Sequence, residues 1–221
     1  PTPIARETLD EAVNNDSEKP SSDRVPEDTK EELTDLSNAC HECGIPLYID
    51  GARLGYGLTS PKTDLTLKEI ANLCDMFYIG GTKCGALMGE ALVILNDKLK
   101  DGFRYIIKQH GGLLAKGRLL GLQFETLFTD NLYFDICKHA VEQAMQIRHA
   151  FEEKGVEMYT DSYTNQQFVI IRDDWMHKLA EKYTFETWEK YDADHTVIRF
   201  CTSWATKDEN VAALVHDIAA L

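Results

Sequence analysis

The sequence has no apolar run near the roughly 20 residues that a membrane-spanning helix needs. Its first residues also lack the basic and then apolar pattern of a secretory signal peptide. Basic residues are scarce: 23 Lys and Arg stand against 37 Asp and Glu, which gives a net charge of −14. Such a surface repels phosphate backbones and anionic lipid headgroups. We therefore expect a cytoplasmic protein that binds neither nucleic acid nor membrane.

Cysteine is also sparse, with six residues at irregular spacing among 221. This is too few for a disulfide framework, so reduced thiols are expected. Cys40 and Cys43 have the C-x-x-C spacing of zinc and redox sites, but no second such pair follows them. Positions three apart share one face of a helix, and a free cysteine packs like a small hydrophobe. We expect packing cysteines and no metal site.

Glycine is absent before Gly44, and residues 1–30 contain no aromatic side chain. The same thirty residues hold four of the six prolines and eight acidic residues against four basic ones. This composition is typical of a linker or a poorly packed lead-in. Because the chain also begins at Pro1 and not at a methionine, we expect it to be a fragment of a longer protein.

The remaining chain has a near-average composition, with 43% hydrophobic and 27% charged residues, so it is expected to fold. Helix and strand patterns alternate from Thr29 onward, which predicts an α/β sheet. Capping boxes, in which a threonine and a glutamate three residues later bond each other's backbone, predict helices after Thr29 and Thr66. Apolar runs predict strands at 45–49, 76–79 and 91–95, and the nearly continuous run at 45–49 is expected to be covered on both faces.

The pattern then turns helical for about sixty residues after Asp97, with a break at Gly111 and Gly112 and an end at Gly155. Short strands and helices are expected after Gly155. We predict residues 31–130 to be part of one α/β domain and residues 131–221 to form a smaller α+β domain.

Lys83 is the first candidate for chemistry, because it lies in the sequence Gly81-Thr82-Lys83-Cys84-Gly85 directly after a predicted strand. Glycines allow a bulky ligand to approach the backbone closely. A lysine held on such a turn can form a Schiff base with a carbonyl group such as that of pyridoxal phosphate. The alternative is a solvated loop lysine, and the residues alone favour neither.

Asp50 lies 33 residues before Lys83, at the end of the preceding predicted strand. Carboxyl ends of neighbouring parallel strands meet at one sheet edge, so the two side chains can lie side by side. There a carboxylate can keep the pyridine nitrogen of pyridoxal phosphate protonated. The alternative is that Asp50 caps the next helix and pairs with Arg53 at the surface.

Three motifs occur in a characteristic order: Tyr48-Ile49-Asp50-Gly51-Ala52-Arg53-Leu54, Gly81-Thr82-Lys83-Cys84-Gly85 and Val197-Ile198-Arg199-Phe200-Cys201-Thr202-Ser203-Trp204. In these motifs the chain resembles the threonine aldolase and β-eliminating lyase family from about Glu32 to its C-terminus. The resemblance implies a partial fold-type I sheet of the aspartate-aminotransferase kind, a pyridoxal 5′-phosphate cofactor and a homo-oligomer, either a dimer or a tetramer.

The resemblance further implies roles for single residues. Lys83 would be the Schiff-base lysine, with Thr82 beside it in the cofactor site, and Asp50 would contact the pyridine nitrogen. Arg53 would contact the cofactor or the substrate carboxylate. Arg199 would hold the substrate α-carboxylate, since a guanidinium can donate two parallel hydrogen bonds to it. The alternative for Arg199 is an ion pair with Asp192 or Asp194.

The implied function is a pyridoxal-phosphate-dependent lyase that cleaves a small β-hydroxy or β-substituted amino acid, such as threonine to glycine and an aldehyde. Two alternatives are an aminotransferase and a non-catalytic fragment of the fold. The chain departs from the family in one large respect: no glycine loop that could hold the cofactor phosphate precedes Asp50. This departure also favours a fragment, and it leaves open whether the 221-residue chain alone is active.

Overall fold

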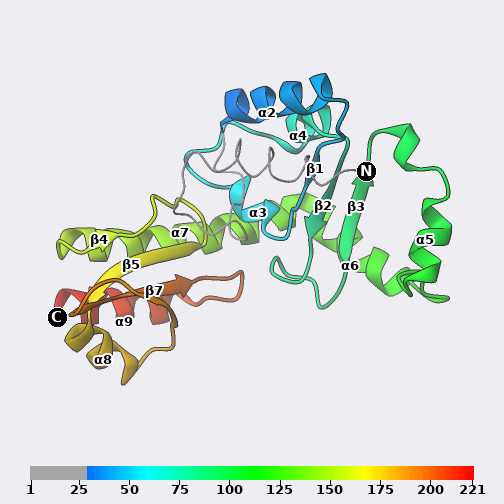
Figure 1. Cartoon of the computed structure of the whole chain (residues 1–221). Coiled ribbons are helices and arrows are strands. Elements are labelled where there is room, and N and C mark those ends of the chain that lie inside the picture. Colours follow the sequence, from blue (N-terminus) through cyan, green and yellow to red (C-terminus); the bar gives the residue numbers. More distant parts are fainter. Residues whose placement is uncertain (1–28) are drawn as a thin grey trace.

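The computed structural model describes residues 29–221. The predicted lead-in, residues 1–30, therefore lies almost entirely outside the described residues. Two units follow, one built on a three-stranded sheet and one on a four-stranded sheet. Figure 1 shows them at opposite ends of the long helix α7, with the C-terminus in the four-stranded unit.

The three-stranded unit begins with alternating helices and strands. They are α2 (Lys30–Glu42), β1 (Tyr48–Ile49), α3 (Leu54–Gly57), α4 (Leu67–Leu73), β2 (Met76–Gly80) and β3 (Glu90–Ile94). The sheet order is β1-β2-β3, with β1 parallel and β3 antiparallel to β2. Both predicted capping boxes are confirmed: Thr29 and Glu32 bond each other's backbone at α2, and Thr66 and Glu69 do so at α4.

A mainly helical segment joins the two units. It consists of η1 (Asp97–Leu99), α5 (Phe103–Gln109), α6 (Arg118–Phe128), η2 (Thr129–Asn131) and α7 (Leu132–Glu153). The predicted break is confirmed, since α5 ends just before Gly111 and Gly112, and Gly111 has a φ of 76°. Gly155, after the end of α7, likewise has a left-handed φ of 78°.

The four-stranded unit contains β4 (Glu157–Met158), β5 (Gln166–Arg172), α8 (Asp173–Ala180), β6 (Glu186–Lys190), β7 (His195–Cys201) and α9 (Asp208–Ala219). Its sheet order is β4-β5-β7-β6, and every pairing is antiparallel. The antiparallel sheet with its helices agrees with the predicted smaller α+β region. The exact domain boundaries at 130 and 131 stay predictions.

Helix α7 contributes to both hydrophobic cores. Tyr133, Cys137 and Val141 pack in the core of the three-stranded unit. Ile147 and Phe151, farther along the same helix, pack against β5, β7 and α9. An amphipathic helix can bury different stretches of one apolar face in two cores. Because both cores share this helix, α7 fixes how the two units are placed relative to each other.

One strand prediction is wrong in its extent and burial. The strand expected at 45–49, covered on both faces, is reduced to the two residues of β1, and Tyr48 is 48% exposed. Among the described strands, β1 pairs with β2 alone. Leu47 and Ile49 are half-buried against the core, whereas Tyr48 between them is exposed, so only one side of this strand is covered.

None of the helices in residues 29–221 combines the length and the apolar composition that a bilayer crossing requires. In the same range all six cysteines are free thiols. Cys40 is buried and Cys43 is exposed on the last turn of α2, so only the first of the pair packs in the interior.

Candidate active site

Two stretches of backbone lie at the carboxyl ends of two adjacent parallel strands. They are the Lys83 turn, residues 80–86, and the Asp50 segment, residues 50–55. Asp50 comes directly after β1, and Lys83 comes three residues after β2. The Gly80 amide donates to the Gly51 carbonyl over 2.8 Å, which ties the two segments together. The predicted parallel pairing at this edge of the sheet is therefore confirmed.

Two glycines allow these segments to approach so closely. A Cβ on Gly51 would lie 1.7 Å from the Tyr78 carbonyl oxygen, and one on Gly80 would lie 2.2 Å from the Ala52 carbonyl oxygen. Both neighbours are backbone atoms, which cannot rotate away as a side chain can. Glycine is therefore required at both positions for the packing seen here.

The turn that carries Lys83 is closed by its own hydrogen bonds. The amides of Cys84 and Ala86 both donate to the Gly81 carbonyl, over 2.9 and 3.0 Å. The Gly81 amide donates to a carboxylate oxygen of Glu90 over 2.8 Å. Thr82 and Lys83 stay exposed at the tip of this turn. The sequence thus places a primary amine on a rigid, solvent-facing turn.

Asp50 accepts two hydrogen bonds through one carboxylate oxygen. The Ala52 amide donates to it over 3.0 Å, and the Tyr78 hydroxyl donates to it as well. Burial and the negative charge of Asp50 both raise the pKa of Tyr78, so its hydroxyl stays protonated and remains a donor. The capping alternative is wrong, because Asp50 bonds the Ala52 amide, which lies before α3, and no side chain caps the first turn of that helix.

Sequence reasoning missed Tyr78. The strand register pairs Ile49 with Phe77, so the next pair along the two strands is Asp50 and Tyr78. Side chains directly opposite on neighbouring strands are in contact. The contact between Asp50 and Tyr78 could therefore be predicted only once the register of β1 and β2 was known.

Arg53 lies directly before α3, on the segment that leaves Asp50, and its side chain is half-buried. Arg199 lies on β7, in the other unit, where it is opposite Glu186 of β6. Its guanidinium donates to Glu186 and, over 2.9 Å, to Gln166. It also lies 5.3 Å above the ring of Trp188.

The predicted alternative partners of Arg199 lie elsewhere. Asp192 is in the turn before β7, where its carboxylate lies 2.9 Å from the Nδ1 atom of His195. Glu186 is the carboxylate that pairs with Arg199. Sequence reasoning missed this partner, because β6 and β7 pair through an irregular register that alternation alone does not reveal.

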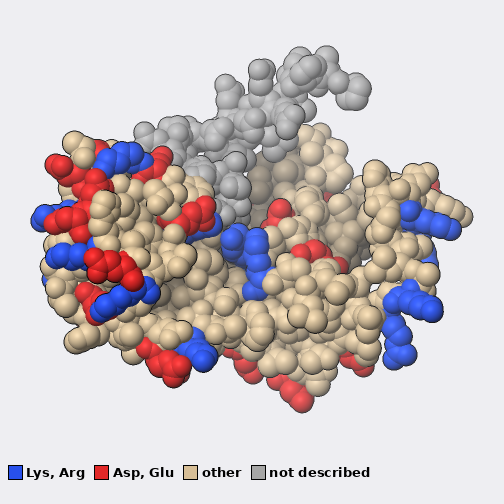
Figure 2. Space-filling view, turned by 90° about the horizontal axis from the view of Figure 1, so that it is seen from below, with Lys and Arg blue, Asp and Glu red and all other residues tan. Residues whose placement is uncertain are grey.

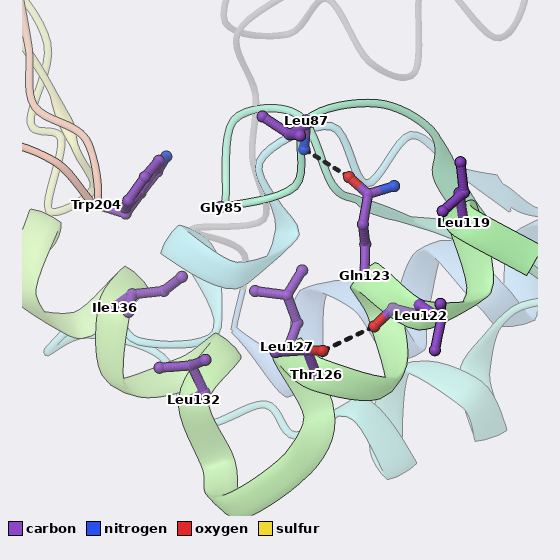
Figure 3. A pocket seen from close by; sticks show the side chains of 10 residues that line it. All are labelled: Gly85, Leu87, Leu119, Leu122, Gln123, Thr126, Leu127, Leu132, Ile136 and Trp204. Atoms are coloured by element: carbon purple, nitrogen blue, oxygen red, sulfur yellow. Dashed lines mark hydrogen bonds between the residues drawn. The ribbon is translucent and has the colours of Figure 1, made fainter.

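A shallow apolar groove of about 470 Å³ lies beside the Lys83 turn (Figure 3). Its lining residues are Gly85, Leu87, Leu119, Leu122, Gln123, Thr126, Leu127, Leu132, Ile136 and Trp204. The Gln123 side chain joins the turn to α6, because it accepts from the Leu87 amide over 2.7 Å and donates to the Met88 carbonyl. Leu87 and Leu119 are strongly exposed, at 88% and 65%.

Charged side chains are distributed unevenly over the surface. On the face drawn in Figure 2, acidic and basic side chains are interspersed over the four-stranded unit, and a group of basic ones lies between the two units. Within residues 29–221, no cluster of three or more His, Cys, Asp or Glu side chains is arranged to hold a metal ion. The polar groups at the sheet edge include the amine of Lys83, the carboxylate of Asp50 and the hydroxyls of Thr82 and Tyr78.

Residues 29–174 match the sequence model of the β-eliminating lyase family. The chain belongs to this family. It is 31% identical over 199 residues to a low-specificity L-threonine aldolase from a Pseudomonas species, an alignment that covers 86% of this chain and 55% of the relative. This chain thus spans about half the length of the curated relatives it matches.

Solved structures of other proteins have the same fold as this β-eliminating lyase family member. The threonine aldolase of Leishmania major superposes with a TM-score of 0.85 at 44% identity, over 87% of this chain and 56% of that one. A serine palmitoyltransferase from Sphingomonas wittichii superposes with a TM-score of 0.60 at 12% identity, over 85% and 50%. The predicted fold class, part of a fold-type I sheet followed by a smaller α+β region, is confirmed.

Proposed function

We propose that this chain forms part of a pyridoxal-phosphate-dependent lyase that cleaves a β-hydroxy amino acid such as threonine into glycine and an aldehyde. The observation that carries the proposal is the juxtaposition of the Lys83 turn and the Asp50 segment, joined by the hydrogen bond from Gly80 to Gly51. An amine and a carboxylate at one sheet edge are the pair that this cofactor chemistry requires. The similarity to threonine aldolases supports the choice of reaction.

The residues present fit two parts of the cofactor, the carbon that is attached to a lysine amine and the pyridine ring. Lys83 supplies an exposed primary amine for covalent attachment, and the Asp50 carboxylate would hold a proton on the pyridine nitrogen. Close packing at Gly51 and Gly80 keeps both segments fixed. Thr82, exposed beside Lys83, offers a hydroxyl for the phosphate. Residues 1–43 contain no glycine, so this stretch supplies no glycine loop for the phosphate.

Arg199 would orient the substrate by binding its α-carboxylate with two parallel hydrogen bonds. Its guanidinium is already oriented, since it stacks over Trp188 and donates to Gln166. Arg53, on the segment after Asp50, would contact the cofactor or the same carboxylate. A guanidinium fixed before substrate arrives loses less entropy on binding, so a carboxylate binds it more tightly.

When bound, pyridoxal 5′-phosphate accepts the electron pair that remains when the bond between Cα and Cβ breaks. The chain's residues then have three tasks: Lys83 holds the cofactor, Asp50 keeps the ring nitrogen protonated, and Arg199 fixes the carboxylate. The same set could serve an aminotransferase, which would pass the amine to a keto acid and release no aldehyde. A non-catalytic fragment of the fold would do neither.

We also propose that the enzyme works in the cytoplasm as a homo-oligomer, a dimer or a tetramer. The exposed leucines on and beside α6, among them Leu119 and Leu122, support an interface with a second copy. The six free thiols agree with a reducing compartment.

The deciding experiment uses the full 221-residue chain with added pyridoxal 5′-phosphate and borohydride, followed by peptide mass mapping. We expect reduction to fix the cofactor on Lys83 in preference to exposed lysines such as Lys98, and Lys83→Ala to abolish that labelling. L-Threonine should then yield glycine and acetaldehyde. Equal labelling of all exposed lysines would contradict the proposal, and amine transfer without aldehyde would select the aminotransferase.

A further inference from the structure

Two tyrosines lie buried beneath the Lys83 turn, and the proposed function leaves them without a role. Tyr56 is on α3 and is 1% exposed, and Tyr133 is on the first turn of α7 and is fully buried. Helix α3 packs against α7 at this point, beside the end of β2 (Figure 1). Full burial of a phenol requires a partner for its hydroxyl.

Each hydroxyl finds that partner on the backbone of the Lys83 turn. Tyr133 donates to the carbonyl of Gly80 over 3.1 Å, at the start of the turn. Tyr56 donates to the carbonyl of Lys83 itself. The two tyrosines therefore hold the segment from Gly80 to Lys83 at both of its ends.

Tyr133 also reaches the segment that carries Asp50. The amide of Gly55 donates to the Tyr133 hydroxyl over 3.1 Å. Gly55 is close enough that a Cβ there would lie 2.8 Å from the Tyr133 ring and 2.5 Å from the Cys137 sulfur. One hydroxyl thus bridges the backbone of α3, which follows β1, to the last residue of β2.

The ring of Tyr133 is held independently of its hydroxyl. It stacks on Phe128, with centroids 5.1 Å apart, and meets Phe134 edge to face at 5.5 Å. A phenylalanine in its place would keep these contacts and lose only the hydrogen bonds. Burial raises the pKa of Tyr133 and of Tyr56 well above the usual range, so both remain donors at every physiological pH.

We propose that Tyr56 and Tyr133 are positioning residues that fix the amine of Lys83 relative to the carboxylate of Asp50. This inference rests on the proposed function, in which that amine carries the cofactor. The hydroxyls act on the backbone and not on the reacting atoms. A turn released from either carbonyl would sample more conformations, so the amine would spend less time where the cofactor must meet it.

The test compares Tyr56→Phe and Tyr133→Phe with Tyr183→Phe in the full chain. Tyr183 is a matched control, because its hydroxyl donates to Asp217 over 2.7 Å in the four-stranded unit, far from the turn in sequence. We expect both site variants to capture pyridoxal 5′-phosphate at Lys83 about 10-fold less efficiently than wild type, the factor for one lost hydrogen bond to a defined group. Tyr183→Phe should capture it as wild type does.

A second readout needs no cofactor. The rate at which a neutral acylating ester modifies Lys83 is measured with Lys98 in the same molecule as internal reference, and amide hydrogen exchange is followed over residues 80–86. We expect a changed acylation rate at Lys83 alone and at least 10-fold faster exchange in Tyr56→Phe and Tyr133→Phe. A purely stabilising role would lower the melting temperature and leave the acylation rate of Lys83 relative to Lys98 unchanged, which would overturn the inference.

Failure of the proposed function and failure of this inference give different results. If wild-type Lys83 captures no cofactor, the proposed function fails, whereas acylation and exchange still decide whether the tyrosines position the amine. If wild type captures cofactor and both phenylalanine variants match it in capture, acylation rate and exchange, the inference alone is wrong.

Discussion

The guanidinium of Arg199 donates to the carboxylate of Glu186 from the neighbouring strand, at the place where a substrate carboxylate is proposed to bind. Glu186 is half-exposed, whereas Arg199 is mostly covered. A half-exposed ion pair contributes up to about 1 kcal/mol. Glu186 is therefore a weak competitor that an incoming carboxylate can displace.

Replacing Glu186 by glutamine removes this competitor. We expect the KM for L-threonine to fall about 2- to 5-fold with kcat unchanged, which corresponds to the weak ion pair. Glu189→Gln, on the same strand and exposed, is the control and should leave KM as it is. Steady-state kinetics measure both. A raised KM in Glu186→Gln would mean instead that Glu186 holds Arg199 in place.

Asp75 joins three segments of the three-stranded unit. Its carboxylate accepts from the Leu47 amide over 2.8 Å and from the Asn96 side chain over 2.7 Å, and it lies 3.0 Å from the Nε2 atom of His41. Of the contacts that lower the pKa of Asp75, the hydrogen bond from the Leu47 amide has the largest effect. A carboxyl with a lowered pKa in the folded state stabilises the fold when it is ionised.

We expect Asp75→Asn to lower the free energy of unfolding by about 2 kcal/mol at pH 7, since asparagine presents a donor where a carboxylate oxygen accepted. The contribution is fully present above the unfolded pKa of about 3.9 and is lost as pH falls through the lower folded value. Urea unfolding of both proteins from about pH 2 to pH 7 should therefore show a difference that is constant above about pH 4 and narrows in acid. A difference that stays constant over this range would contradict the assignment.

Gly80 should tolerate no side chain. Gly80→Ala would place a Cβ 2.2 Å from the Ala52 carbonyl oxygen, so we expect a loss of about 3 kcal/mol or more in the free energy of unfolding. Gly121→Ala is the matched control, because no atom lies within 4 Å of its Cβ position in α6. That substitution should stabilise the protein by about 0.5–1 kcal/mol. Equal melting temperatures for the two variants would show that the glycine contact does not matter.

The exposed leucines beside the Lys83 turn are predicted to lie in the interface between copies. Leu119→Glu introduces a charge that cannot be buried without large cost, so the oligomer should dissociate. Tyr191→Glu, at a side chain of the four-stranded unit that is 50% exposed, should leave the assembly intact. Light scattering of the full chain gives the mass. An unchanged mass for Leu119→Glu would place the interface elsewhere.

Local sequence patterns were sufficient for most helices and strands. The Thr29 and Thr66 capping boxes, the glycines at 111 and 155, and the alternation of apolar runs each depend on neighbours within a few residues. Such interactions hold in any surroundings, which is why they can be recognised in a sequence alone. The same holds for the placement of Lys83 and Asp50 at the ends of successive strands.

Contacts between distant segments were decided by tertiary structure. Tyr78 meets Asp50 through the strand register, and Glu186 meets Arg199 through an irregular pairing. Tyr133 lies 53 residues from the carbonyl that it holds. These partners follow from how two sheets and α7 pack together, and packing depends on the whole chain at once. The sequence by itself determined which groups are available for chemistry, and the fold decided which of them touch.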